Sequence, residues 1–217
     1  MIEVKNLSKS FGEKGVLSDL NFSVAHGQSV AIVGKSGAGK SVLLKCLIGL
    51  VKPDEGTIYV DNKLINSMNF SQLQEIRSNI GMVFQDYQLL NDRNVFHNVA
   101  LPLHVMGYNA NEIPYRVEEA LDLVGFEGKR GHYPDELSGG EKQRVTLARA
   151  IVKEPDIILA DEPTGNLDPV AAFELVQLLE TINNNGTTIL MASHNYNLIK
   201  GRGRRILELK DGAIRGS

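Results

Sequence analysis

The chain has 217 residues, of which 42% are hydrophobic, 23% charged and 6% aromatic, a composition typical of globular proteins and unlike that of disordered or fibrous ones. The 23 basic and 26 acidic residues give a net charge of −3, which offers no electrostatic indication of a nucleic-acid partner. A single cysteine, Cys46, excludes an internal disulfide bond. No stretch approaches the roughly 18 apolar residues needed to cross a bilayer, so we expect any membrane role to come through a partner.

The first residues of the chain have the pattern of antiparallel strands. Residues 1–7 and 16–25 alternate apolar and polar side chains, as half-exposed strands do. Residues 57–60 continue this alternation and end in the turn pair Asp61 and Asn62. We therefore expect a small antiparallel sheet in this part of the chain.

A glycine-rich loop connects a predicted strand, residues 29–33, with a predicted apolar helix, residues 41–50. The loop fits the pattern G-x-x-x-x-G-K-[ST], in which successive backbone N–H groups bind phosphate oxygens. In such a loop Lys40 reaches the β- and γ-phosphates and the Ser41 hydroxyl binds Mg²⁺. The alternative is an ordinary glycine-rich turn without a ligand. The loop consists of Gly34, Lys35, Ser36, Gly37, Ala38, Gly39, Lys40 and Ser41.

The remainder of the chain alternates predicted helices with buried strands. Between residues 91 and 131 the strand pattern fades, and we expect a helical insertion there. Two later runs, residues 157–160 and 187–192, are uniformly apolar, as strands buried on both faces are. Helices are predicted over residues 113–124, 141–152 and 169–183.

Polar residues follow both of these buried runs. Asp161 and Glu162 follow the first run and His194 follows the second. Ligands of open α/β sheets bind beyond the carboxyl ends of the strands, so we expect Lys40, Glu162 and His194 to face one site. Asp161 is a candidate ligand of Mg²⁺, and Glu162 is a candidate base for the water that attacks the γ-phosphate. Taken alone, the two acids would equally fit a helix N-terminus or an exposed turn.

A second glycine-rich segment precedes the predicted helix at residues 141–152. A serine and two glycines before a helix create a second N-terminus able to bind an anion, whereas a hydrolase with one self-contained site needs only one. The segment is Leu137-Ser138-Gly139-Gly140-Glu141-Lys142-Gln143-Arg144. It resembles the signature sequence of ABC-type ATPases, and residues 2–212 as a whole resemble the nucleotide-binding subunit of that family.

This resemblance implies an α/β fold of the P-loop type, with a mostly parallel core sheet, an antiparallel β subdomain and a helical subdomain inserted at about residues 87–150. We expect residues 1–217 to form this single domain. The resemblance also implies hydrolysis of ATP with Mg²⁺ by a head-to-tail homodimer. Each ATP would then lie between the phosphate loop of one subunit and the signature segment of the other.

Roles of individual residues follow from the same resemblance. Phe11 matches the aromatic residue that stacks on adenine, and Gln85 matches the glutamine that contacts Mg²⁺ and the attacking water and senses a membrane partner. His194 matches the residue that contacts the γ-phosphate, and residues 165–168 match a loop that communicates between subunits. The expected catalytic residues are Glu162, His194 and Gln85, and the expected metal ligands are Ser41, Gln85 and Asp161. The expected nucleotide contacts are Phe11, Gly34, Lys35, Ser36, Gly37, Ala38, Gly39, Lys40, Ser41, Val42, Ser138, Gly139, Gly140 and Glu141.

Finer resemblances favour one subfamily. Residues 84–103 and 194–209 are similar to the FtsE family of bacterial cell-division ATPases, and the short length of the chain agrees with that family. Residues 159–168 are shared by FtsE and by the lipoprotein-releasing and macrolide-export ATPases. Val42 departs from the FtsE pattern, which usually has threonine here, and is similar to the valine of phospholipid-trafficking ATPases.

The FtsE resemblance implies an integral membrane partner of the FtsX or permease type, and a peripheral location on the cytoplasmic face of the inner cell membrane. ATPases of lipoprotein, macrolide or phospholipid transport are the main alternative. A soluble ABC protein acting on ribosomes or DNA is a remote one, since such proteins usually carry two nucleotide domains or a long insertion. A non-catalytic scaffold would tolerate the loss of Glu162 or Lys40, and both residues are present.

Overall fold

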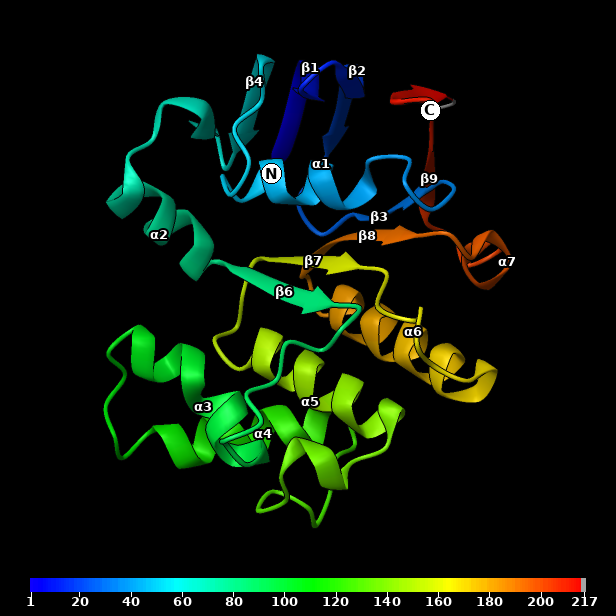
Figure 1. Cartoon of the computed structure of the whole chain (residues 1–217). Helices are drawn as coiled ribbons and strands as arrows, with labels where there is room; N and C mark the ends of the chain where they lie inside the picture. Colours follow the sequence, from blue (N-terminus) through cyan, green and yellow to red (C-terminus); the bar gives the residue numbers. More distant parts are fainter. Residues whose placement is uncertain (216–217) are drawn as a thin grey trace.

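The computed structural model describes residues 1–215, so that residues 216 and 217 of the predicted domain lie outside the described residues. A four-stranded antiparallel sheet with the order β2-β1-β4-β5 forms one part of the molecule (Figure 1). Its strands are β1 (Ile2–Phe11), β2 (Lys14–Val24), β4 (Glu55–Val60) and β5 (Lys63–Leu64). The antiparallel strands predicted from alternating side chains are therefore present.

A β-bulge adjusts the alternation within β1. Ile2 and Val4 are buried with the expected period of two, but the next buried side chain is Leu7. The pairing of β1 with β2 shifts register between Val4 and Leu7, where Asn6 has a φ of 48°. Such a bulge inserts one residue and re-aims the side chains that follow. The core face of β1 thus continues although the strict alternation in the sequence is broken.

A six-stranded sheet with the order β10-β9-β3-β8-β7-β6 lies at the centre of the molecule (Figure 1). Its strands from β9 to β6 pair in parallel, and only β10 runs antiparallel to its neighbour. The strands are β3 (Ser29–Val33), β6 (Ile80–Phe84), β7 (Ile157–Asp161), β8 (Thr188–Ser193), β9 (Arg205–Lys210) and β10 (Ala213–Arg215). The predicted α/β fold with a mostly parallel core sheet is confirmed.

The central sheet lies between two hydrophobic cores, as β7 illustrates. Ile157 and Leu159 belong to the core shared with helix α1 (Lys40–Leu47) and the antiparallel sheet. Ile158 and Ala160 belong to the core on the opposite face, which the longer helices cover. Successive side chains of a strand point to opposite faces, so a strand buried on both faces must be apolar throughout. This is why the uniformly apolar runs in the sequence are parallel strands.

Three helices form the layer that was predicted as a helical insertion, and Figure 1 shows them together below the central sheet. They are α3 (Val95–Val105), α4 (Ile113–Leu123) and α5 (Gly139–Ile151). The remaining helices are α2 (Phe70–Ser78), α6 (Pro169–Asn184), α7 (Tyr196–Ile199) and the short 3₁₀ turns η1 (Ile65–Ser67) and η2 (Pro134–Glu136). No helix within residues 1–215 combines the length and apolar character needed to span a bilayer.

Several boundaries and elements differ from the sequence-based expectations. The helix expected at residues 41–50 ends at Leu47, because Gly49 adopts a left-handed φ of 65° that stops a helix. The helix expected at residues 141–152 begins two residues earlier, at Gly139. Helix α2 was not predicted, since Ile76 is its only fully buried side chain and its apolar periodicity is correspondingly weak.

Candidate nucleotide-binding site

The phosphate loop connects the end of β3 with the start of α1. Gly39 precedes α1 with a φ of 103°, and a Cβ atom there would lie 2.8 Å from the Leu17 side chain. A Cβ atom at Gly34 would lie 2.3 Å from the carbonyl oxygen of Leu209. Both positions therefore require glycine, because neighbouring atoms leave no room for a Cβ atom. Gly39 also requires it because of its left-handed backbone conformation. The loop consequently leaves the backbone N–H groups at the N-terminus of α1 available to an anion.

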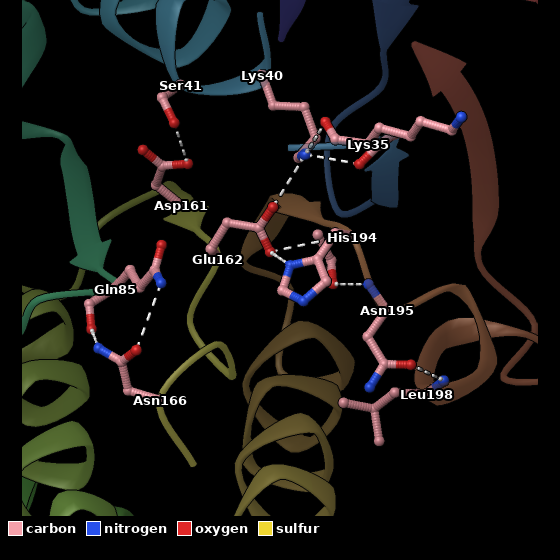
Figure 2. A network of polar contacts seen from close by, with 12 residues as sticks. Lys35, Lys40, Ser41, Gln85, Asp161, Glu162, Asn166, His194, Asn195 and Leu198 are labelled. Atoms are coloured by element: carbon pink, nitrogen blue, oxygen red, sulfur yellow. Dashed lines mark hydrogen bonds and ion pairs between the residues drawn. The ribbon is translucent and has the colours of Figure 1, made fainter. Parts of the chain in front are cut away.

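Lys40 is held at the centre of this loop. Its Nζ donates hydrogen bonds to the carbonyl oxygens of Gly34 at 2.7 Å and Lys35 at 3.0 Å. The same nitrogen forms an ion pair with Glu162 Oε1 at 3.0 Å (Figure 2). The side chains of Lys40 and Glu162 are only 4% and 11% exposed. The ammonium group thus has a full set of acceptors, and a phosphate that binds here must replace some of them.

Glu162 connects this lysine to the next strand. The other carboxylate oxygen, Oε2, accepts a hydrogen bond from the backbone N–H of His194 at 3.0 Å and lies 2.8 Å from His194 Nδ1. Glu162 itself has a left-handed φ of 47°, and its N–H donates to the carbonyl oxygen of Ala192. Lys40 begins α1 after the loop that follows β3, and Glu162 and His194 come directly after β7 and β8. The structure brings these three residues together (Figure 2).

Asp161 and Ser41 form a second pair of oxygen atoms at the same site. The Ser41 hydroxyl donates to Asp161 Oδ1 at 2.9 Å, although the two residues are 120 positions apart. Burial raises the pKa of the Asp161 carboxyl, the hydrogen bond from Ser41 opposes that shift, and the neighbouring Glu162 adds to it. Hydroxyl and carboxylate oxygens are ligands that suit Mg²⁺. Among the described residues no group of three or more His, Cys, Asp or Glu side chains could hold a metal by itself.

Gln85 follows β6 and approaches the site from the helical side. The backbone after it turns through Tyr87 and Gln88, which both have left-handed φ angles of 60° and 49°. Arg149 on α5 donates to the carbonyl oxygens of these two residues at 2.7 and 2.6 Å. The side chain and carbonyl of Gln85 contact Asn166. The segment that carries Gln85 is therefore fixed from two directions.

Lys40, Glu162 and His194 line an open cavity of about 340 Å³ together with Ser41 and Gln85, whereas Asp161 does not line it. The volume is within the size range of small-molecule sites. Val16 on β2 also lines the cavity, and no motif in the sequence indicated a role for this residue. A neighbouring cavity of about 410 Å³ extends along the other side of the phosphate loop. The first cavity is lined by Val16, Ser36, Gly37, Gly39, Lys40, Ser41, Val42, Gln85, Glu162 and His194.

Phe11, one of the predicted nucleotide contacts, lies outside both of these cavities. It ends β1 with 52% of its surface exposed, and the ammonium group of Lys9 lies 5.2 Å from its ring centre. This exposure is too large for a core residue at the edge of the sheet. An exposed ring face is available to stack on a planar ligand.

The second anion-binding segment also lies apart from the phosphate loop within the chain. Ser138 caps α5 by accepting a hydrogen bond from the N–H of Glu141, and Glu141 Oε2 accepts from the N–H and hydroxyl of Ser138. The hydrogen bond from Lys129 and the two from Ser138 lower the pKa of Glu141 to about 2. None of the four residues Ser138, Gly139, Gly140 and Glu141 lines either cavity at the phosphate loop.

Comparison with known proteins agrees with this arrangement. The sequence profile of ABC transporters matches residues 17–165. The chain is 43% identical over 216 residues to the cell division ATP-binding protein FtsE of Bacillus subtilis, covering 99% of this chain and 94% of that protein. It is 44% identical over 216 residues to the methionine import ATP-binding protein MetN of Clostridium acetobutylicum, covering 99% of this chain and 68% of that protein.

Among solved structures, a dimeric ATP-binding cassette in a post-hydrolysis state with ADP and Pi matches with a TM-score of 0.90 and 37% sequence identity. The match covers 100% of this chain and 97% of the other. A family profile over most of the chain and relatives of this identity over nearly its full length both indicate the same family. The phosphate loop, the paired acids after β7 and the capped signature helix therefore belong to an ATP-hydrolysing subunit, and the chain is a member of the ABC transporter family.

Proposed function

We propose that two copies of this chain bind two ATP molecules between them. Each ATP lies between the phosphate loop of one subunit and residues 138–141 of the other. The observation that carries the proposal is that one chain has two anion-binding helix N-termini, at α1 and α5, and that only the first opens into the cavity of the phosphate loop. The dimeric state of a solved relative supports the same assembly.

Within each site, binding of ATP replaces Glu162 as a partner of Lys40. The γ-phosphate takes its place beside the ammonium group, and the released carboxylate accepts a proton from the attacking water. His194, which holds the same carboxylate in the free chain, then contacts the γ-phosphate. Phe11 stacks on the adenine ring through its exposed face.

Ser41, Asp161 and Gln85 are the residues that would hold Mg²⁺. The contact between Ser41 Oγ and Asp161 Oδ1 places two oxygen ligands together, and Gln85 lines the same cavity. Mg²⁺ commonly takes one or two protein oxygens and completes its shell with waters and substrate phosphates. The ion would neutralise charge on the phosphates, and these side chains would hold it close to Lys40.

We further propose that residues 1–217 form one ATPase domain, with a helical subdomain at about residues 87–150, that binds an integral membrane protein at the cytoplasmic face of the cell membrane. A groove of about 360 Å³ supports the place of contact, because it lies between the edge strand β6 and the helices α3 and α5 (Figure 1). It includes Phe84 and Gln88, on either side of Gln85 in the sequence. A partner in this groove would displace the segment that carries Gln85.

The membrane partner that we favour is of the FtsX type, with a function in cell division. Residues 84–103 and 194–209 resemble the FtsE family. In addition, the similarity to FtsE of Bacillus subtilis covers 99% of this chain. A transport function is the second candidate, because MetN of Clostridium acetobutylicum is equally similar at 44% identity. The same class includes the ATPases of lipoprotein release and macrolide export, which resemble this chain in residues 159–168. It also includes the phospholipid-trafficking ATPases, which resemble it in the valine at position 42.

The hydrolysis mechanism is tested by Glu162→Gln. The substitution keeps the size of the side chain and removes its basicity, so ATP binding should persist while kcat falls by roughly 10²- to 10⁴-fold, the usual contribution of a positioned base. Calorimetry and phosphate release measure the two quantities. The matched control is Glu75→Gln on α2, whose exposed carboxylate pairs only with Lys63. Near-normal turnover in the Glu162 variant would exclude this residue as the base.

The choice between cell division and transport needs a cellular experiment. Cells depleted of the protein, or carrying only the Glu162→Gln form, should grow as filaments with unseparated septa. Microscopy of the same cells complemented with the wild-type gene provides the control. Normal septation combined with a defect in methionine uptake, or with mislocalised lipoproteins or lipids, would favour the transport candidate.

A further inference from the structure

Gln85 and Asn166 form a reciprocal contact that the reaction scheme above does not use. Asn166 Nδ2 donates to the carbonyl oxygen of Gln85 at 3.0 Å, and Gln85 Nε2 donates to Asn166 Oδ1 at 3.4 Å. The two residues are 81 positions apart in the sequence. They meet because β6 and β7 are parallel neighbours whose ends are paired, so the segments that follow them leave the sheet side by side (Figure 2).

Gly165 provides the space for this contact. A Cβ atom at Gly165 would lie 2.9 Å from Gln85 Nε2 and 3.1 Å from Gln85 Cδ. The nearest atoms all belong to the Gln85 side chain. Glycine therefore allows the glutamine side chain to lie directly against the backbone of residue 165, where the amide of Asn166 meets it.

The loop that carries Asn166 is fixed independently of Gln85. The N–H of Gly165 donates to the carbonyl oxygen of Glu162 at 3.0 Å, and that of Leu167 donates to the carbonyl oxygen of Thr164. Asp168 caps α6 by accepting hydrogen bonds from the N–H groups of residues 170 and 171. The loop is thus attached to both Glu162 and the long helix α6. It can define the position of Gln85 because its own position does not depend on that residue.

From this geometry we infer that Asn166 is a positioning residue for Gln85. It holds the glutamine amide and the backbone behind it so that the side chain faces Mg²⁺ and the attacking water. The role suits asparagine, since one short amide both donates to the Gln85 carbonyl and accepts from the Gln85 side chain. Aspartate would lose the donor, and alanine would lose both. The inference rests on the proposed role of Gln85 in hydrolysis and extends it to a residue that does not face the nucleotide.

The first test is a cycle of Asn166→Ala and Gln85→Ala, read out as kcat and as KM for ATP. Loss of one or two exposed hydrogen bonds should lower kcat by about fivefold, while KM changes less than about twofold because Lys40 and the phosphate loop are untouched. In the Gln85→Ala background, Asn166→Ala should have no further effect on kcat, since it acts through a side chain that is no longer present. Asn69→Ala is the matched control, because Asn69 only caps α2.

Gly165→Ala provides the second test. The added methyl group meets only the flexible end of Gln85, so we expect little loss of thermal stability but a displaced glutamine and a kcat reduced at least as much as in Asn166→Ala. Gln85→Ala removes the Cγ, Cδ and Nε2 atoms that lie within 3.4 Å of the new methyl group. Gly165→Ala should therefore become neutral in that background. A purely structural role of Gly165 would leave its effect undiminished there.

The outcomes separate this inference from the proposed function. Normal kcat in Gln85→Ala alone would overturn the role of Gln85, and the inference with it. A reduced kcat in Gln85→Ala together with an Asn166→Ala variant that behaves like Asn69→Ala would overturn the inference alone. Full additivity of the two alanine substitutions would do the same, because Asn166 would then act independently of Gln85.

Discussion

At the scale of the residue, the ammonium group of Lys40 is fully engaged by its own chain. Three acceptors surround its ammonium group, and one of them is the carboxylate of Glu162. Both members of this ion pair are almost entirely buried. Separating one buried charge from its partner is unfavourable, because water cannot replace the lost interaction. The residue proposed to bind the phosphates of ATP and the residue proposed as the base are therefore linked in the free chain.

This linkage predicts a stability effect in the absence of nucleotide. Lys40→Ala leaves the Glu162 carboxylate buried with only His194 as partner, so the free energy of unfolding should fall by about 2 kcal/mol. Urea unfolding followed by circular dichroism measures it. The double variant Lys40→Ala/Glu162→Gln should recover part of the loss, since the amide carries no charge. Simple additivity of the two single effects would show that the pair contributes no coupling energy.

At the scale of the element, the start of α5 combines a structural cap with the signature segment. Ser138 and Glu141 exchange hydrogen bonds in a capping box, which satisfies N–H groups that have no partner inside the helix. Lys129 adds a charged contact to the same carboxylate. Helix α2 begins with an equivalent box in which Gln72 replaces the glutamate. The cap itself therefore needs only the amide or carboxylate oxygen, and the charge of Glu141 is a separate contribution.

Glu141→Gln isolates that charge and predicts a pH dependence. The pKa of Glu141 is lowered to about 2, chiefly by the hydrogen bond from Lys129. A lowered carboxyl pKa stabilises the folded state above the unfolded pKa of about 4.5, and this stabilisation disappears as the pH falls toward 2. Because the pair is partly exposed, the variant should lose at most about 1 kcal/mol at pH 7. Urea midpoints at pH 7, 5 and 3 should converge at the acidic end.

The reciprocal variant is the control for this interpretation. Lys129→Met removes the same charged contact and should reproduce the loss at pH 7 in the wild-type background. It should have little further effect in the Glu141→Gln background, because the partner charge is already absent. A gap between wild type and Glu141→Gln that stays constant with pH would contradict the assignment.

For the whole molecule, the positions of the N-termini of α1 and α5 are the basis of the proposed dimer. One chain provides the cavity at the phosphate loop, and residues 138–141 remain outside it. In a head-to-tail dimer the phosphate loop of each chain would face residues 138–141 of the other chain. The two-fold symmetry of such a dimer produces two equivalent sites. In such a dimer each active site contains residues of both chains. A substitution in the phosphate loop of one chain and a substitution in residues 138–141 of the same chain would therefore affect different sites.

Mixed dimers test this arrangement. A Lys40→Ala chain paired with a Gly139→Asp chain places both lesions in one composite site and leaves the second site intact. A doubly substituted chain paired with a wild-type chain places one lesion in each site, and the added carboxylate repels the γ-phosphate across the interface. The first mixture should therefore dimerise with ATP better than the second, as measured by size-exclusion chromatography. The reverse order would contradict sites that are shared between the two chains.

The sequence by itself determined the features that depend on neighbouring residues. The phosphate loop from Gly34 to Ser41 was predictable because glycines at set spacings permit a backbone that other residues cannot adopt. The strands β3, β7 and β8 were predictable because burial on both faces requires uninterrupted apolar runs. Local chemistry and periodicity are sufficient for such features.

Only the tertiary structure decided which distant groups meet. Two examples are the ion pair of Lys40 with Glu162 and the hydrogen bond from Asn166 to the carbonyl oxygen of Gln85. Both depend on the order of strands in the central sheet, which no local pattern specifies. Helix α2 and strand β10 escaped prediction because few of their side chains are buried, so their sequences carry little periodicity. Strand β9 was missed although its buried Leu207 and Leu209 alternate with exposed residues. Residues far apart in the chain come together through packing, and packing is a property of the whole fold.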